Sequence, residues 1–192
     1  VGNENGFAGA TNWSFLRAGE VYPGYPKYRE LQYGHADGNQ WVAAECDVSI
    51  RPGWFYHPEE DDKVKTVDQL TDLYYRSVGH NATLLLNFPV DRNGLIHPTD
   101  SLNAVSFHQR VQKELADNLL SSAKVSASDE RGGQFKVRGV TDGKYDTYWA
   151  TNDGVTTADL TFTFSQPTKM NRVMIQEYIP LGQRVKSFVV EY

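Results

Sequence analysis

The chain has 192 residues, which is enough for one domain or two small ones with a buried core. Its net charge of −5 and its scattered Lys and Arg residues argue against a nucleic-acid partner, which requires a basic face. A single cysteine, Cys46, excludes an intrachain disulfide, and no apolar run reaches the roughly 18 residues that span a bilayer. Cys46 lies in an apolar stretch, so we expect a small buried side chain rather than a nucleophile.

Residues 1–40 are rich in Gly, Asn, Pro and Tyr, and are predicted to form long loops of the kind that carry functional side chains. A buried strand is predicted next, over residues 41–50. It contains two carboxylates, is flanked by tryptophans and ends at a Pro-Gly break before a histidine; these residues are Trp41, Glu45, Asp47, Trp54 and His57. Aromatic rings stack on sugar C–H groups and carboxylates bind hydroxyls, so the stretch indicates a sugar site, with a buried aromatic corner as the alternative.

Two helices and a second strand follow. Thr66 and Gln69 have the spacing of a capping box, so a helix is predicted to begin at Thr66 and to end at Gly79. Residues 81–88 are apolar on both faces, as in a parallel strand, and residues 100–120 are predicted to form a second helix. The apolar stripe of this helix is Ala104, Phe107 or His108, Val111, Leu115 and Leu119. This alternation predicts a parallel α/β sheet or barrel.

The pattern changes after residue 121. Helical periodicity is lost, and short alternating strands are predicted at residues 159–164, 171–176 and 184–192, separated by Gly, Asp, Asn and Pro turns. We therefore predict two domains, residues 1–121 and 122–192, the second an all-β sandwich or jelly roll. The chain begins on a polar loop without Met and ends within a predicted strand, so we expect it to be part of a longer protein.

Several spaced motifs in the first domain resemble one enzyme family. Residues 1–6, 12–14, 44–56 and 84–96 are similar to the second half of the catalytic barrel of glycoside hydrolase family 29, the α-L-fucosidases. The resemblance covers most of residues 1–120 and is closest to the subgroup that prefers α-1,3/1,4-linked fucose. It implies the C-terminal half of a (β/α)8-type barrel, acting on fucosylated oligosaccharides or glycoproteins and located in the periplasm or secreted.

The second domain resembles the first part of a discoidin-like (F5/8 type C) module. The residues that carry this resemblance are 140–150 and 172–177. It implies a carbohydrate-binding-type sandwich with a structural calcium held by oxygens of Asp142 and Thr147 and by backbone carbonyls. A polar turn closed by Asp142 is the alternative, and a module that only stabilises the barrel is also open.

The family resemblance implies a retaining mechanism. One carboxylate attacks the anomeric carbon, and a second, roughly 5–5.5 Å away, protonates the leaving oxygen and later activates water. No aspartate motif of this chain matches the nucleophile, which we expect upstream, so this chain alone is expected to be inactive. Glu4 stands where the family has its acid/base; an ordinary loop glutamate is the alternative. Glu45 is the second candidate, otherwise expected to orient the site.

The resemblance also implies a wall for the sugar. Trp54 stands where family members place an aromatic ring against the C5-methyl group of fucose, and such an apolar wall discriminates by about 1–3 kcal/mol. Trp13 and Trp41 are weaker candidates for the surroundings of the next sugars, and His57 is a candidate donor to hydroxyls. No metal or cofactor is expected for catalysis. The alternative function is a non-catalytic glycan-binding protein on a degenerate barrel scaffold.

Overall fold

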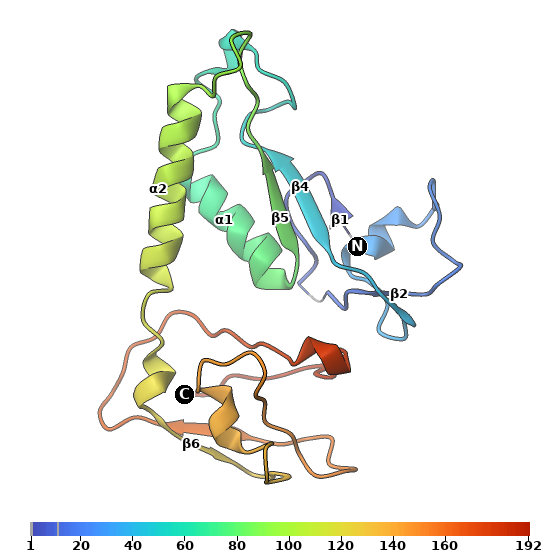
Figure 1. The fold of residues 1–192 in the computed structure, drawn as a ribbon, viewed down its shortest axis with the longest axis vertical. Coiled ribbons are helices and arrows are strands. Elements are labelled where there is room, and N and C mark those ends of the chain that lie inside the picture. Colours follow the sequence, from blue (N-terminus) through green and yellow to red (C-terminus); the bar gives the residue numbers. More distant parts are fainter. Residues whose placement is uncertain (1, 11) are drawn as a thin grey trace. The chain divides into compact units, whose positions relative to one another are not determined.

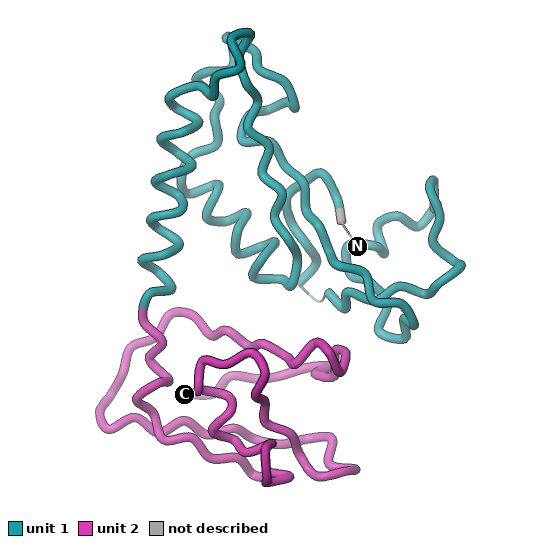
Figure 2. The backbone as a smooth tube through the Cα atoms, viewed as in Figure 1, with its two compact units in different colours: residues 1–116 teal, residues 117–192 magenta. Residues whose placement is uncertain are grey.

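The computed structural model describes residues 2–10 and 12–192. The chain forms two compact units, Val1–Ala116 and Asp117–Tyr192, shown in different colours in Figure 2. Each unit is described by itself below. Among the described residues, no helix has both the length and the apolar character needed to cross a bilayer.

A three-stranded parallel sheet organises the first unit. Its strands are β1 (Gly2–Asn3), β4 (Glu45–Ser49) and β5 (Thr83–Asn87), in the order β1-β4-β5. Two helices, α1 (Val67–Ser77) and α2 (Pro98–Glu114), follow β4 and β5 (Figure 1). Glu45 is paired with Gly2 on one side and with Thr83 on the other. This β–α–β–α order is the α/β arrangement that the sequence predicts.

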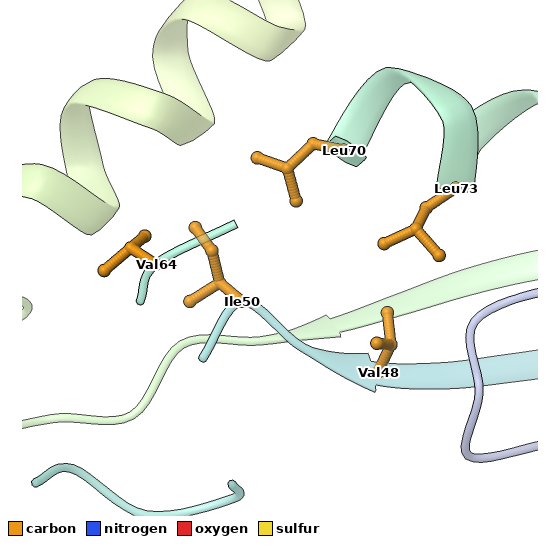
Figure 3. Packing of buried hydrophobic residues seen from close by; sticks show 5 residues of the cluster. All are labelled: Val48, Ile50, Val64, Leu70 and Leu73. Carbon is orange, nitrogen blue, oxygen red and sulfur yellow. The ribbon is translucent and has the colours of Figure 1, made fainter. Parts of the chain in front are cut away.

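The core of this unit lies between the sheet and α1. Val48 and Ile50 project from β4 and its end toward Leu70 and Leu73 of α1, and Val64 completes the cluster (Figure 3). Leu84, Leu86 and Phe107 pack against it from β5 and α2. Burying an aliphatic side chain contributes about 1.5–3 kcal/mol, so this cluster is the main source of stability for the sheet and for the loops that leave it.

The predicted capping box is present at the start of α1. The Thr66 side chain accepts a hydrogen bond from the Gln69 backbone N–H, and the Gln69 side chain accepts one from the Thr66 N–H. Helix α2 ends at Glu114, six residues before the predicted end at residue 120. Leu115 and Leu119, which the predicted stripe included, are 45% and 39% exposed, so no apolar contact extends the helix. A separate 3₁₀ turn, Leu119–Ser122, follows.

The strand predicted over residues 41–50 is two strands. β3 (Gln40–Trp41) pairs antiparallel with β2 (Phe15–Leu16), whereas β4 begins only at Glu45, in the parallel sheet. The two segments have different hydrogen-bonding partners, which a run of strand-forming residues cannot reveal. The break separates Trp41 from the rest of the motif.

The second unit has less regular structure than predicted. β6 (Lys124–Ala127) pairs antiparallel with β7 (Leu160–Thr163), the latter within the predicted strand 159–164. Residues 171–176 and 184–192 form no strand, so those two predictions are wrong. A strand needs a hydrogen-bonded neighbour, and alternation alone does not supply one. The rings of Phe135, Tyr148 and Tyr178 stack in succession and hold the irregular segments together.

Candidate functional site

The parallel sheet of the first unit has two ends with different chemistry. We call the carboxyl edge the end where β1, β4 and β5 finish, with residues 4–6, 50–61 and 88–97. We call the amino edge the opposite end, with residues 12–16, 33–42 and 80–82. Figure 1 shows the loops that follow β4 and β5 at one end and β2 at the other. Open parallel sheets bind ligands at the carboxyl ends of their strands, so the carboxyl edge is the candidate site.

Glu4 is exposed in a tight turn that follows β1. Asn3 shapes the turn, because its Oδ1 accepts a hydrogen bond from the Asn5 N–H at 2.8 Å and its Nδ2 donates to the Phe7 carbonyl at 2.5 Å. Gly6 has a φ of +78°, and a Cβ there would lie 2.8 Å from Leu73 Cδ2 and 2.9 Å from a Val48 methyl. Only glycine fits both the conformation and the space, so the turn that presents Glu4 is seated on the core.

Two further carboxylates lie on the neighbouring strand. Glu45 and Asp47 alternate along β4 and therefore share a face of the sheet. Because Asn3 is paired with Cys46, Glu4 follows at the level of Asp47. Glu45 is exposed and has no side-chain hydrogen bond or ion pair with the described residues, and one oxygen of Asp47 is buried without a hydrogen-bond partner among them. These carboxylates are not locked in ion pairs, which leaves them available to a ligand.

Cys46, between the two carboxylates, points into the opposite face. Its side chain is 1% exposed and packs in a small cluster with Ala8, Ala44 and Ala82. Burial raises the pKa of the Cys46 thiol. A buried thiol is a poor nucleophile, in agreement with the expectation of a small buried side chain.

Trp54 and His57 lie in the loop that leaves β4 at the carboxyl edge. Both are exposed, Trp54 by 41%. The Trp54 carbonyl accepts a hydrogen bond from Asn87 Nδ2 at 3.1 Å, and the same nitrogen donates to Ser49 Oγ at 3.1 Å. The loop therefore folds back onto the ends of β4 and β5, so its tryptophan lies near the level of Ser49. Two residues of strand, about 7 Å, separate this level from that of Asp47 and Glu4.

Trp13 and Trp41 lie at the amino edge. The Trp13 N–H donates to the Tyr33 carbonyl, and the adjoining Asn12 donates from its buried side chain to the carbonyls of His80 and Asn81, just before β5. Trp41 is paired with Phe15 in the β2–β3 ribbon. The structure thus brings Glu4, Trp54 and His57 to one edge of the sheet and places the other two tryptophans at the opposite one.

Three residues that sequence reasoning did not select hold the Trp54 loop. They are Arg51, Asp61 and Asp100. Arg51 is fully buried, and its hydrogen bonds to Asp100 raise the pKa of the guanidinium. A side chain so enclosed does not donate to sugar hydroxyls. No local pattern could have paired it with Asp100, which is 49 residues away in the sequence.

Asp142 and Thr147 lie together in the second unit but do not by themselves form a calcium site. Thr147 Oγ1 donates to both carboxylate oxygens of Asp142, at 2.9 and 2.8 Å, and this hydroxyl lowers the pKa of Asp142. Calcium takes six to eight oxygen ligands, and the described residues hold no group of three or more His, Cys, Asp or Glu side chains fit for a metal. Lys136, Arg138 and Lys144 line the same hollow and repel a cation.

Comparisons with known proteins cover both units. Residues 123–192 match the model of the F5/8 type C domain. The whole chain is 40% identical to a provisionally named α-L-fucosidase 1 from Oryza sativa subsp. japonica and 38% identical to α-L-fucosidase 1 from Arabidopsis thaliana. It spans 37% and 38% of the lengths of these two relatives.

Solved structures of α-L-fucosidases are also similar to this chain. A provisionally named α-L-fucosidase from Bacteroides thetaiotaomicron superposes with a TM-score of 0.80 at 44% identity, over 85% of this chain and 36% of that one. A GH29 fucosidase from Ruminococcus gnavus, solved in complex with fucose, gives a TM-score of 0.72 at 33% identity, over 83% of this chain and 33% of the other.

Proposed function

We propose that this chain, which is similar along its whole length to α-L-fucosidases, supplies part of the active site of a glycoside hydrolase family 29 enzyme. The complete protein would remove terminal α-L-fucose from oligosaccharides or glycoproteins. The observation that carries the proposal is the carboxyl edge itself, where the exposed Glu4 follows β1 and the exposed Trp54 and His57 follow β4. An exposed acid and an aromatic surface at the same edge of a sheet are what a terminal sugar requires.

Glu4 is proposed as the acid/base. Its turn follows β1 at the level of Asp47, on the strand that also carries Glu45, so the three carboxylates lie along neighbouring strands. Glu4 would protonate the glycosidic oxygen as the bond breaks and then accept a proton from the attacking water. Glu45 remains the second candidate, since it is equally exposed and unpaired among the described residues.

The nucleophile is proposed to lie outside this chain. The relatives are more than twice as long as the segment matched here, so the other half of the site has room elsewhere in such a protein. In a retaining mechanism that carboxylate attacks the anomeric carbon while Glu4 acts on the leaving oxygen. This division predicts that the 192-residue chain alone has no activity.

Trp54 is proposed to stack against the C5-methyl group of fucose, with His57 donating to a hydroxyl. Both lie in one loop, so they would reach the same sugar ring. The position of Trp13 and Trp41 at the amino edge favours structural roles for them over the aglycone contacts that the sequence suggested. A preference for α-1,3/1,4 linkages, as in the similar subgroup, is part of the proposal and is tested by comparing Lewis-type with α-1,2-fucosylated oligosaccharides.

Calcium in the second unit and a secreted or periplasmic location stay predictions of the resemblance. The donor set at Asp142 and Thr147 counts against the metal, and no step of the mechanism depends on it. Calcium titration of the complete gene product and of its Asp142→Asn variant, followed by thermal unfolding, tests the metal. Equal melting temperatures with and without calcium would contradict the prediction.

The decisive experiment is Glu4→Gln in the complete gene product, assayed on a fucosylated oligosaccharide and on 4-nitrophenyl α-L-fucoside. We expect the oligosaccharide rate to fall by about 10²–10⁴-fold, because the amide cannot protonate a poor leaving group. The nitrophenyl substrate, whose leaving group needs no proton, should lose less, and azide should restore turnover. Glu20→Gln, an exposed loop glutamate, is the matched control.

The same assay separates the alternatives. If Glu45→Gln showed the large loss and Glu4→Gln did not, the acid/base would be Glu45. If the unaltered protein bound fucosylated glycans without cleaving either substrate, the chain would belong to a non-catalytic glycan-binding protein.

A further inference from the structure

Arg51 is a buried cation at the end of β4. Its side chain is 0% exposed, as is that of Asp100 in the first turn of α2. Its Nε and Nη2 donate to the two carboxylate oxygens of Asp100 at 2.8 and 2.9 Å. A bidentate pair of a guanidinium and a carboxylate restricts the relative orientation of the two groups. A buried charge that loses its partner strongly destabilises the fold. The pair therefore fixes the guanidinium relative to both β4 and α2.

The remaining contacts of the guanidinium all go to the loop between Arg51 and Asp61. Nη2 forms an ion pair with Asp61 Oδ1 at 2.9 Å, and Nη1 donates to the His57 carbonyl at 3.4 Å. The Tyr56 ring lies against the guanidinium at 4.6 Å, and its hydroxyl donates to Asp61 at 3.4 Å. The loop is thus wrapped around a charge whose position is already fixed.

Trp54 lies inside this wrapped segment. Its carbonyl is held by Asn87, and the residues on its C-terminal side are held by Arg51, so the exposed ring is carried on a loop secured at both ends. Lys65 secures the strand end too, donating to the Ser49 carbonyl at 2.7 Å. A sugar wall works only when held close to its productive position, and a shift of an ångström is enough to weaken it.

We infer that Arg51, with Asp100 and Asp61 as its carboxylate partners, is a positioning residue that sets the selectivity of the site for a 6-deoxy sugar. It acts by holding the Trp54 loop in one conformation, so that the ring meets a methyl group and leaves no room for a hydroxymethyl group. This inference rests on the proposed function. Arg51 itself touches no substrate.

The test measures a ratio rather than a rate. In the complete gene product, Arg51→Lys is assayed on the 4-nitrophenyl glycosides of α-L-fucose and α-L-galactose, which differ only by the 6-hydroxyl. Lysine keeps the charge but loses the fork. We expect KM for the fucoside to rise and the preference for fucoside over galactoside in kcat/KM to fall about tenfold. A role confined to stability would lower the rate on both glycosides by the same factor.

Arg110→Lys is the matched control, since Arg110 forms ion pairs with Glu114 and Asp68 among the helices, away from the loop. The fucoside-to-galactoside ratio of kcat/KM in this variant should equal that of the unaltered protein. If Arg51→Lys fails to fold, Asp61→Asn removes only the partner on the loop and should shift the ratio in the same direction. An unchanged ratio in the variant that folds would overturn the inference. Failure of the unaltered protein to cleave either glycoside would instead overturn the proposed function, and this inference with it.

Discussion

The two edges of the parallel sheet are stabilised by different interactions. At the carboxyl edge, charged side chains hold the loop after β4: the buried Arg51 is paired with Asp100 and Asp61. At the amino edge, neutral amides hold the loops: Asn12 and Asn81 donate to one another's backbone carbonyls, Asn81 also donates to Ser14 Oγ, and Asn12 accepts from the Ser14 N–H. Both edges carry tryptophans, and under the proposed function only the tryptophan at the carboxyl edge, Trp54, contacts the sugar.

The largest expected difference between the edges concerns the tryptophans. Trp54→Ala should lower kcat/KM for an aryl α-L-fucoside by about 10–100-fold, because it removes the apolar wall for the methyl group. Trp41→Ala, at the amino edge, should leave kcat/KM within about twofold of the unaltered protein, because only side chains that contact the substrate contribute to its selection. Steady-state kinetics on the complete gene product measure both. Equal losses in the two variants would remove the distinction between the edges.

The next effect is on stability. Asn12→Ala removes a buried amide that donates to the carbonyls of His80 and Asn81 and accepts from the Ser14 N–H. Leaving buried polar groups unpaired should cost about 1–3 kcal/mol in the free energy of unfolding. Urea unfolding measures the loss, with the exposed Gln109→Ala as control. The fucoside-to-galactoside ratio should not change; a changed ratio would link the amino edge to the sugar site.

The smallest effect is a pH dependence of stability at the carboxyl edge. The Asp91 carboxylate accepts hydrogen bonds from the backbone N–H groups of Leu95 and Asn93, which lower its pKa. The unfolded chain therefore takes up a proton first as the pH falls, so this stabilisation is present above pH 3.8 and is lost below it. Asp91→Asn should flatten the acid side of the stability curve. An unaltered slope in urea titrations from about pH 4 downward would contradict it.

Local signals in the sequence were enough to predict the two helices and β5, but not β1, which lies in a stretch expected to form loops. The capping box at Thr66 and the apolar run of β5 each depend on only a few neighbouring residues, so α1 and β5 were predictable. The end of α2 was not, because it depends on whether Leu115 and Leu119 find apolar neighbours. Of the strands expected in the second unit, those at residues 171–176 and 184–192 did not form for a related reason, since pairing depends on a neighbour elsewhere in the chain.

The site was predictable only in part. Glu4 and Trp54 were selected by family resemblance and His57 from the aromatic cluster after the strand, and the direction of β1 and β4 brings all three to one edge. The separation of Trp41 from Trp54 was missed because the sequence gives no sign that the strand breaks at residues 42–44. Arg51 was not selected from the sequence. Its partner Asp100 lies beyond the reach of any local pattern, and its burial became visible only with the fold.

Gly6 couples the presentation of Glu4 to the cooperative unfolding of the first unit. Since a Cβ at this position would lie within 3 Å of Leu73 and Val48, the turn is packed so closely on α1 and β4 that it should rearrange only when they open. The amide hydrogens of the turn should therefore exchange with solvent as slowly as those of the core, and more slowly than those of the loops. At Gly19 and Gly24, by contrast, a Cβ would meet no atom within 4 Å beyond the adjoining residues. Insertions should be tolerated around those two glycines and rejected between Asn3 and Gly6, where the position of Glu4 is set by the core.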